Sequence, residues 1–211
     1  SPKCGKGDVK CVIAVGDALI ADRQAALTKF SGKVAADLTA QHITTDQAND
    51  LQTTITENQT DLTTLKTKLD QETDTKAARV DVRNVYTQLR IFAVVLPRDY
   101  RKLHLDLLVQ LDAKLKGLEP QLQQSISSAS ADKQAQLSTL FTDYKTQLTN
   151  AESQLDTANA AFPSLTPANF NTDRTTYETT LKGLSQAEQA AHADLHQAAK
   201  DYHQIAQLLK K

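Results

Sequence analysis

The sequence predicts an all-α protein and, within that class, an elongated antiparallel helical bundle or coiled coil of long helices. Gly and Pro are scarce, at six and five of 211 residues, whereas all-β folds need frequent turn residues. In several segments apolar residues recur at alternating three- and four-residue intervals, and none sustains an alternation of period two. This spacing places one narrow apolar stripe on each helix, which is the geometry of bundles and coiled coils.

Capping residues define the first two predicted helices. Asp8 can cap a first helix that ends at about residue 40, and Thr44 with Gln47 forms a capping box that opens a second helix, which fades near residue 72. The inward positions expected for the first helix are Val12, Val15, Leu19, Leu27, Phe30, Val34 and Leu38, and those of the second are Ala48, Leu51, Ile55, Leu62, Leu65 and Leu69.

Proline sets the expected limits of the next two helices. A third helix begins at about Thr75 and meets Pro97, whose ring displaces an intrahelical hydrogen bond and therefore kinks or ends the helix. A fourth begins at Arg98 and extends past Pro120 to Ile126. Their inward positions are expected at Ala78, Val82, Val85, Leu89, Phe92 and Leu96, then at Leu103, Leu107, Leu111, Leu115 and Leu118.

The remaining sequence predicts two more helices. The serine-rich segment 127–132 is the clearest linker, a fifth helix ends at Phe162, and Thr166 with Pro167 caps a sixth. The seam of the fifth helix is Leu137, Phe141, Tyr144, Leu148, Ala151, Leu155, Ala158 and Phe162. Rods this long pack economically side by side, so we expect residues 1–211 to form a single elongated bundle. Seams this regular can also pair between chains, so a homo-oligomer is an alternative.

Polar residues interrupt three of these seams. Asn58, Arg174 and Glu188 each stand where the spacing calls for an apolar side chain. One polar residue in a seam commonly fixes register at a cost in stability, and we assign that role to Asn58. Glu188 has two alternatives, a cation across the bundle or a metal ion.

The two cysteines indicate an oxidising compartment. Cys4 and Cys11 are separated by six residues that include two glycines, so a tight loop can bring the sulfurs together. A local disulfide is expected, and such bonds persist in secreted proteins. A first residue of Ser1 instead of Met fits a mature secreted chain, and equally a shortened one. We therefore expect a secreted protein, extracellular or at the cell surface.

Basic residues gather around the third helix and the proline that follows it. Between residues 76 and 102 seven cationic side chains face only Asp81 and Asp99. A solvated helix face explains this surplus, and the alternative is docking to an anionic glycan, a cell-wall polymer or a lipid surface. The cations are Lys76, Arg79 and Arg83, together with a candidate partner surface of Arg90, Arg98, Arg101 and Lys102.

The same region carries a resemblance. From Arg90 the sequence is Arg-Ile-Phe-Ala-Val-Val-Leu-Pro, apolar on all sides between Ile91 and Leu96. Over residues 85–108 the chain resembles secreted bacterial all-helical coiled-coil proteins of unknown function. The resemblance implies an extracellular helical protein and transfers no catalytic residue. The apolar stretch itself is a buried crossing point or, alternatively, a face that docks a partner or touches a membrane.

Three histidines share one face of the last predicted helix. His192, His196 and His203 fall close together around the helix axis, and Glu188 lies one turn before His192. Imidazoles four residues apart can bind a transition metal, and the carboxylate extends the set. We therefore name Glu188, His192 and His196 as a candidate site for a divalent transition metal such as zinc or copper, or for a haem-like ligand. Without a ligand from a neighbouring helix they are ordinary surface residues.

These observations favour a binding or structural role. No nucleophile motif, phosphate loop or paired carboxylate for acid–base work is present, so we expect no enzyme and no required cofactor. The formal charge of −1 disfavours nucleic acid as a partner, and no apolar run is long enough for a transmembrane segment. We expect an extracellular or cell-surface structural or interaction module that contacts a protein or a cell-envelope polymer. The alternatives are a metal- or ligand-binding bundle and a membrane-active, pore-forming helical protein.

Overall fold

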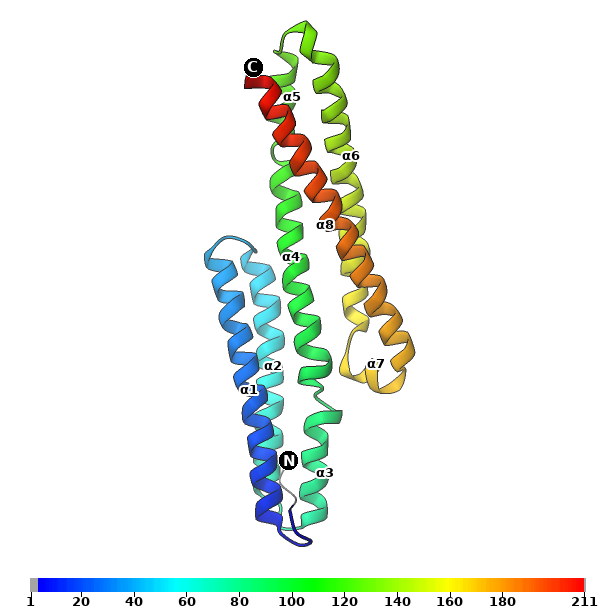
Figure 1. Cartoon of the computed structure of the whole chain (residues 1–211). Coiled ribbons are helices and arrows are strands. Elements are labelled where there is room, and N and C mark those ends of the chain that lie inside the picture. Colours follow the sequence, from blue (N-terminus) through cyan, green and yellow to red (C-terminus); the bar gives the residue numbers. More distant parts are fainter. Residues whose placement is uncertain (1–3, 211) are drawn as a thin grey trace. The chain divides into compact units, whose positions relative to one another are not determined.

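The computed structural model describes residues 4–210, and every regular element among them is a helix (Figure 1). The all-α prediction is therefore confirmed. Contacts divide the chain into two compact units, named here unit 1 (residues 4–103 and 164–177) and unit 2 (residues 104–163 and 178–210). The elements are α1 (Val9–Thr39), α2 (Thr45–Asp70), α3 (Thr75–Thr87), the π-helical turn η1 (Ile91–Val95), α4 (Leu96–Lys116), α5 (Glu119–Ser127), α6 (Ala131–Ala161), the 3-10 turn η2 (Phe162–Ser164), α7 (Pro167–Thr172) and α8 (Arg174–Lys210).

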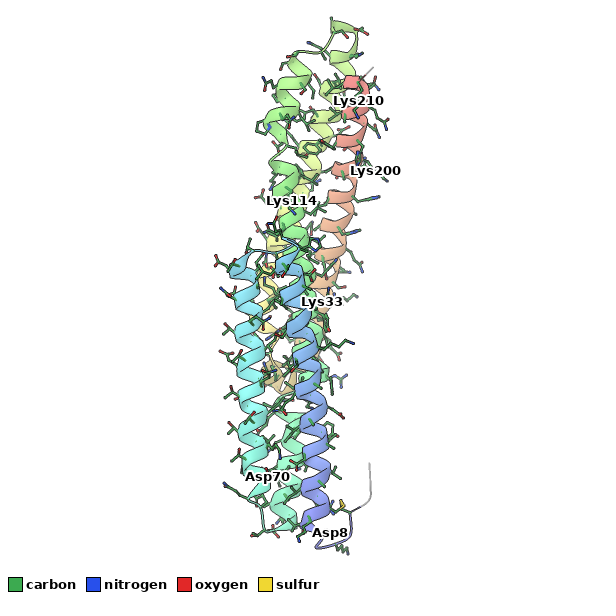
Figure 2. All side chains as sticks on the ribbon, turned by 90° about the vertical axis from the view of Figure 1, so that its left-hand side faces the viewer. Asp8, Lys33, Asp70, Lys114, Lys200 and Lys210 are labelled. Atoms are coloured by element: carbon green, nitrogen blue, oxygen red, sulfur yellow. A yellow bond between two sulfur atoms is a disulfide. The ribbon has the colours of Figure 1, made fainter. Side chains whose placement is uncertain are left out.

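In unit 1, α1 and α2 form an antiparallel pair with α3 beside them (Figure 1). Asp8, the N-cap of α1, and Asp70, the last residue of α2, lie at the same end of the pair (Figure 2). The predicted capping box is present, because the Thr44 hydroxyl accepts from the Gln47 amide while the Gln47 side chain accepts from the Thr44 amide. The apolar side chains between these helices are fully buried at Ile20, Leu27, Phe30, Val34, Leu62 and Leu69.

One glycine allows the close approach of α1 to its neighbours. A Cβ added at Gly16 would lie 2.3 Å from Leu69 Cδ2 on α2 and 2.9 Å from Val82 Cγ2 on α3. The position therefore excludes every larger residue unless the neighbours move. The glycine stabilises the unit through this packing although it is a poor helix former.

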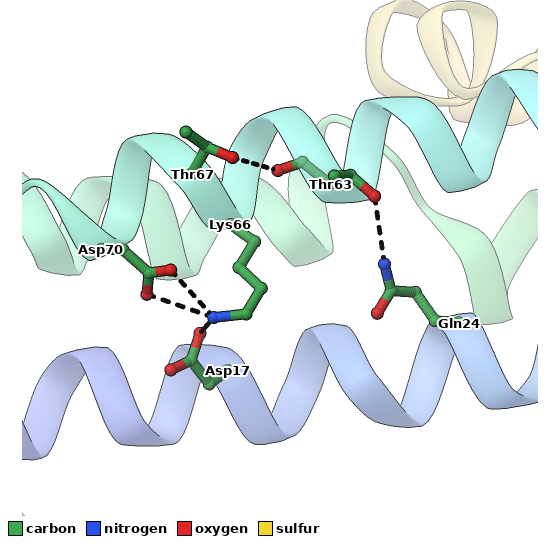
Figure 3. Close-up of polar contacts among 6 residues, drawn as sticks. All are labelled: Asp17, Gln24, Thr63, Lys66, Thr67 and Asp70. Atoms are coloured by element: carbon green, nitrogen blue, oxygen red, sulfur yellow. Dashed lines mark hydrogen bonds and ion pairs between the residues drawn. The ribbon is translucent and has the colours of Figure 1, made fainter.

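Polar pairs fix the register between α1 and α2 (Figure 3). Lys66 Nζ lies 2.7 Å from Asp17 Oδ1 across the pair and 2.9 Å from Asp70 Oδ2 on its own helix. Further along, the Gln24 amide donates to the Thr63 hydroxyl at 3.3 Å. Asn58, to which we assigned the register role, donates instead to the Thr54 carbonyl of its own helix. The register rests on pairs at the edge of the seam.

Threonine hydroxyls on α2 bond back to their own helix. Each hydroxyl donates its one proton to the carbonyl oxygen four residues earlier, so that proton is not available to another acceptor. The residues that do so on α2 are Thr54, Thr56, Thr60, Thr63, Thr64 and Thr67. The hydroxyl groups are therefore satisfied within the helix, and the threonine-rich stretch of α2 is helical throughout.

The third predicted helix breaks before the apolar stretch, so the expectation that Pro97 kinks or ends it was wrong. The helix α3 ends at Thr87, and Arg90 adopts a left-handed conformation with φ 48° and ψ 33°. Asn171 of α7 holds the break, because its amide donates to the Thr87 carbonyl at 2.6 Å and its oxygen accepts from Arg90 Nε at 2.9 Å. Pro97 instead lies in the first turn of α4, where proline is tolerated.

In unit 2 the helix α6 buries the seam that the spacing predicts. Leu137, Phe141, Tyr144, Leu148, Ala151, Leu155 and Ala158 are all buried. The Tyr144 hydroxyl donates to the Leu115 carbonyl of α4, and burial raises the pKa of this phenol well above its usual range. The predicted fourth helix divides at Gly117 into α4 and α5, and α5 ends at Ser127 before α6 begins at Ala131.

The prediction for the part of α4 in unit 2 is confirmed at Leu115, which is buried, and is wrong at Leu111. Leu111 is 40% exposed, whereas Asp112 is only 7% exposed. Lys116 forms an ion pair with Asp112, with the lysine Nζ 2.9 Å from Oδ2 of the carboxylate. Further carboxylates of unit 2 are buried at Asp106, Glu188 and Asp201. Burial raises the pKa of both Asp112 and Asp201, although the hydrogen bonds from Lys116 and Gln197 act to lower it.

Candidate anion-binding site

The structure separates the three residues named for a metal. Glu188 is buried and its Oε1 contacts His104 Nδ1 of α4, while His192 and His196 are exposed. The two histidine rings lie parallel with their centroids 6.5 Å apart. Across residues 4–210, no three His, Cys, Asp or Glu side chains gather closely enough to hold one metal ion. The metal site stays a prediction, and the side chain that Glu188 contacts on a neighbouring helix is the imidazole of His104.

The four residues named as a partner surface are partly buried. Arg90 bonds to Asn171 and stacks over the Phe170 ring, with its guanidinium carbon 4.8 Å from the ring centroid. Arg98 pairs with the buried Asp99, with Nη2 2.7 Å from Oδ1. Arg101 and Lys102 are engaged as well. These residues serve contacts within the chain and do not form one exposed basic face.

A different basic group surrounds a hollow in unit 1. The hollow has a volume of about 760 Å³ and lies between the loop that precedes α1 and the first two turns of α3. Its lining comprises Lys6, Gly7, Asp74, Thr75, Lys76, Arg79, Val80 and Arg83. We call this the basic hollow.

The predicted disulfide between Cys4 and Cys11 closes the loop that forms one wall of the basic hollow. Gly7 has a φ of +87°, a conformation that favours glycine, and it turns the chain back toward α1. Asp8 then caps α1 by accepting from the Cys11 amide at 3.0 Å. Arg79 ties this loop to α3, because its guanidinium donates to the Cys4 carbonyl at 3.2 Å.

The other wall is the N-terminal half of α3. Asp74 caps the helix, and its carboxylate accepts from the Ala77 amide at 2.8 Å. Residues 76, 79 and 83 recur at three- and four-residue intervals, so Lys76, Arg79 and Arg83 project from one face of α3. The free amides at the start of the helix add partial positive charge to the same place.

The charges of the basic hollow are largely unpaired. In the part of the chain that the structure describes, the side chains of Lys6, Lys76 and Arg83 make no hydrogen bond or ion pair, and all three are exposed. Asp74 is the only carboxylate in the lining, and it is occupied by the helix cap. The lining therefore has four cations and one carboxylate, and that carboxylate already accepts the hydrogen bond that caps α3. This excess of positive charge creates a potential that attracts an anion with several charges.

Sequence reasoning found part of this group. Lys76, Arg79 and Arg83 were recognised as a basic side of the third helix, explained as a solvated face, with docking to an anionic polymer or lipid surface as the alternative. Arg90 was placed with them, but it is separated because α3 ends at Thr87. Lys6 was missed, since only the closed disulfide loop brings it beside α3.

No protein family, curated protein or solved structure matches this chain. Over residues 4–210, no helix combines the length and the apolar character needed to cross a membrane.

Proposed function

We propose that this chain is a non-catalytic interaction module, extracellular or at the cell surface, whose basic hollow binds an anionic polymer of the cell envelope. The observation that carries the proposal is the set of three exposed cations without partners, Lys6, Lys76 and Arg83, around one hollow. Natural surfaces usually disperse or pair such charges, and their convergence on one concave place favours a ligand of opposite charge.

In this proposal the long helices form an elongated antiparallel bundle that presents the hollow at a fixed position. The register pairs between α1 and α2 and the close approach at Gly16 support a rigid frame for α3. The disulfide supports the extracellular assignment, because it closes one wall of the hollow and such bonds persist mainly in oxidising compartments.

Binding should depend steeply on salt. The cations are exposed, so each contributes little alone and is screened over about 8 Å at physiological ionic strength. A polymer that contacts several of them together releases its own counterions, and added salt opposes that release. A sharp loss of affinity with rising salt is therefore the signature of this kind of site.

The test measures binding of the whole chain to a labelled polyanion, for which we choose polygalacturonate and long-chain polyphosphate, by fluorescence anisotropy between 50 and 300 mM NaCl. The triple variant Lys76→Gln, Arg79→Gln and Arg83→Gln should bind about tenfold or more weakly and with a shallower salt dependence. The matched control changes Lys29, Lys182 and Lys210 to Gln, which removes the same charge elsewhere and should alter affinity less than twofold.

Binding that is absent, insensitive to salt, or equally reduced by both triple variants would overturn the proposal. Circular dichroism of each variant excludes loss of helix as the cause. Since all three substituted residues of the hollow are exposed, we expect both variants to keep the helical spectrum of the parent chain.

A further inference from the structure

A cation is buried in unit 1 beside the same face of α3. Arg23 of α1 is only 4% exposed, and its Nη1 donates to the Leu19 carbonyl at 2.8 Å. Its Nε has no hydrogen-bond partner in the described chain, and burial lowers the pKa of its guanidinium. The sequence spacing places this arginine in the apolar seam of α1, where we did not expect a charge.

Two aromatic rings cover this guanidinium. Its central carbon lies 4.7 Å from the ring centroid of Tyr86 on α3 and 5.0 Å from that of Phe92 in η1. The two ring residues remain 43% and 50% exposed. Arg23 therefore makes cation–π contacts with both rings, and a large part of each ring residue remains open to solvent. The prediction that Phe92 points inward was wrong.

Tyr86 continues the line of cations along α3. Positions 79, 83 and 86 follow one another at four- and three-residue intervals, so Arg79, Arg83 and Tyr86 lie on one stripe of the helix. Tyr86 lies one turn beyond Arg83, about 4.5 Å along the axis. A ligand that reaches from the basic hollow along α3 meets charges first and ring faces next.

Resting on the proposed anion-binding function, we infer that the ligand is an acidic polysaccharide whose charged groups enter the basic hollow and whose sugar rings stack on Tyr86 and Phe92. The C–H face of a sugar ring is apolar and packs on an aromatic face, while its hydroxyl groups stay in water. The buried Arg23 contacts the rings of Tyr86 and Phe92 and keeps both in position. The arrangement therefore selects a polymer that offers both negative charge and ring faces.

Two other polyanions fit less well. Polyphosphate has charge but no ring, so it gains nothing from the Tyr86 and Phe92 faces. A single-stranded nucleic acid needs cations that follow its backbone beside the stacked bases. Here the cations are grouped at one end of the stripe and the rings at the other, in a chain whose net charge is −1. Both polymers are competitors in the test.

The experiment compares polygalacturonate, long-chain polyphosphate and oligo-dT as probes of the whole chain by fluorescence anisotropy. We expect Tyr86→Leu with Phe92→Leu to weaken polygalacturonate binding about five- to twentyfold and polyphosphate binding less than twofold. Tyr86→Phe keeps the ring and should retain affinity within about twofold. The matched control, Tyr202→Leu, changes a partly exposed tyrosine of α8 in unit 2 and should leave all affinities unchanged.

A second measurement does not depend on removing a ring. The chain has no tryptophan, so Tyr86→Trp introduces a single tryptophan beside Phe92, whose emission can be excited separately from that of the tyrosines. Polygalacturonate should quench or shift its emission, whereas Tyr202→Trp should not respond.

The outcomes separate the two proposals. If no polyanion binds, or none depends on the cations, the proposed function fails. If polyanions bind but the leucine variants affect polygalacturonate and polyphosphate equally, and Tyr86→Trp emission is unchanged, only the polysaccharide inference fails. A preference for oligo-dT with the same loss on removal of the rings would assign the stripe to single-stranded nucleic acid and overturn the inference.

Discussion

The buried charges of unit 1 differ in their partners from one buried carboxylate of unit 2, Asp201. Unit 1 gives its buried charges a partner, because Asp81 lies 2.6 Å from Lys68 Nζ and Arg23 is covered by two rings, and it leaves several cations unpaired at the surface. In unit 2 Asp201 is 3% exposed, its Oδ1 accepts from Gln197 and its Oδ2 has no hydrogen-bond partner among the described residues.

This difference indicates which substitutions of buried charges should lower the stability of the fold and which should raise it. A buried charge with a partner stabilises only while that partner remains, whereas a buried carboxylate without a cation destabilises the fold until it takes up a proton. Asp99 is the exception in unit 1, since burial raises its pKa although Arg98 is paired with it. The exposed cations of the basic hollow in unit 1 thus offer a surface for binding, whereas the buried Asp201 makes the stability of unit 2 sensitive to pH.

The largest expected contrast concerns helical glycines. Gly16→Ala should lower the free energy of unfolding by about 2 kcal/mol, because its Cβ would overlap Leu69 and Val82. Gly183→Ala in α8 meets nothing within 4 Å and should raise that free energy by about 0.5–1 kcal/mol through helix propensity. Urea unfolding measures both, and Gly32→Ala in α1, which is equally open, is the control within unit 1. A neutral Gly16→Ala would show that the helices of unit 1 approach less closely.

The same substitution at two buried aspartates should have opposite signs. Asp81→Asn removes one charge of the pair with Lys68 and should lower the free energy of unfolding by about 1–2 kcal/mol. Asp201→Asn removes a buried carboxylate that has no cation beside it, and it should raise the free energy of unfolding by up to about 1 kcal/mol at pH 7. Chemical denaturation followed by circular dichroism measures both effects. Equal signs would remove the distinction between the units.

The pH dependence isolates the contribution of Asp201. Burial raises the folded-state pKa of this carboxyl above its unfolded value, so its contribution to stability is most favourable below the unfolded pKa and is lost as pH rises through the folded pKa. The advantage of Asp201→Asn should therefore be largest at pH 7 and shrink toward zero near pH 4. Urea titrations of both proteins at each pH test this, and a constant difference across the range would contradict it.

The smallest expected effect links the disulfide to the basic hollow. Replacing both Cys4 and Cys11 by Ser opens the loop that carries Lys6 and should weaken polyanion binding about threefold, while Lys76, Arg79 and Arg83 stay in place. Lys6→Gln in the oxidised protein should give a similar loss. Anisotropy titrations compare the two variants, and an unchanged affinity in both would exclude the loop from the site.

Local signals predicted much of the fold. The capping box at Thr44 and Gln47 and the buried seam of α6 from Leu137 to Ala158 follow from spacing and from hydrogen bonds within a few residues. Thr166 caps a helix as predicted, but that helix is the short α7, and the long α8 begins separately at Arg174. The break after Thr87 could not be predicted, because the side chain that holds it, Asn171, comes from a helix more than 80 residues later. The seam of α4 was predicted only in part. Leu103 and Leu115 are buried as expected, but leucines occur on several faces of this helix, and packing buries Leu105 and Leu108 while it leaves Leu111 exposed.

Only part of the candidate site could be predicted from the sequence. The cations of α3 recur at helical spacing, but Lys6 joins them through a covalent loop and Arg23 is accommodated only because Tyr86 and Phe92 come from other elements. A charge in an apolar seam signals such an arrangement. The heptad pattern of the first helix skips position 23, and that gap was the available clue.

The back-bonded threonines of α2 have a consequence for solvent and for other molecules. Their protons are already committed to the helix's own carbonyls, so to an approaching molecule these hydroxyls present lone pairs and methyl groups instead of donors. Water, which supplies its own protons, wets such a flank readily. A foreign carbonyl oxygen gains no hydrogen bond from these hydroxyls, whereas an N–H group can still donate to them, as the Gln24 amide does to Thr63. This flank therefore selects for molecules that bring donors.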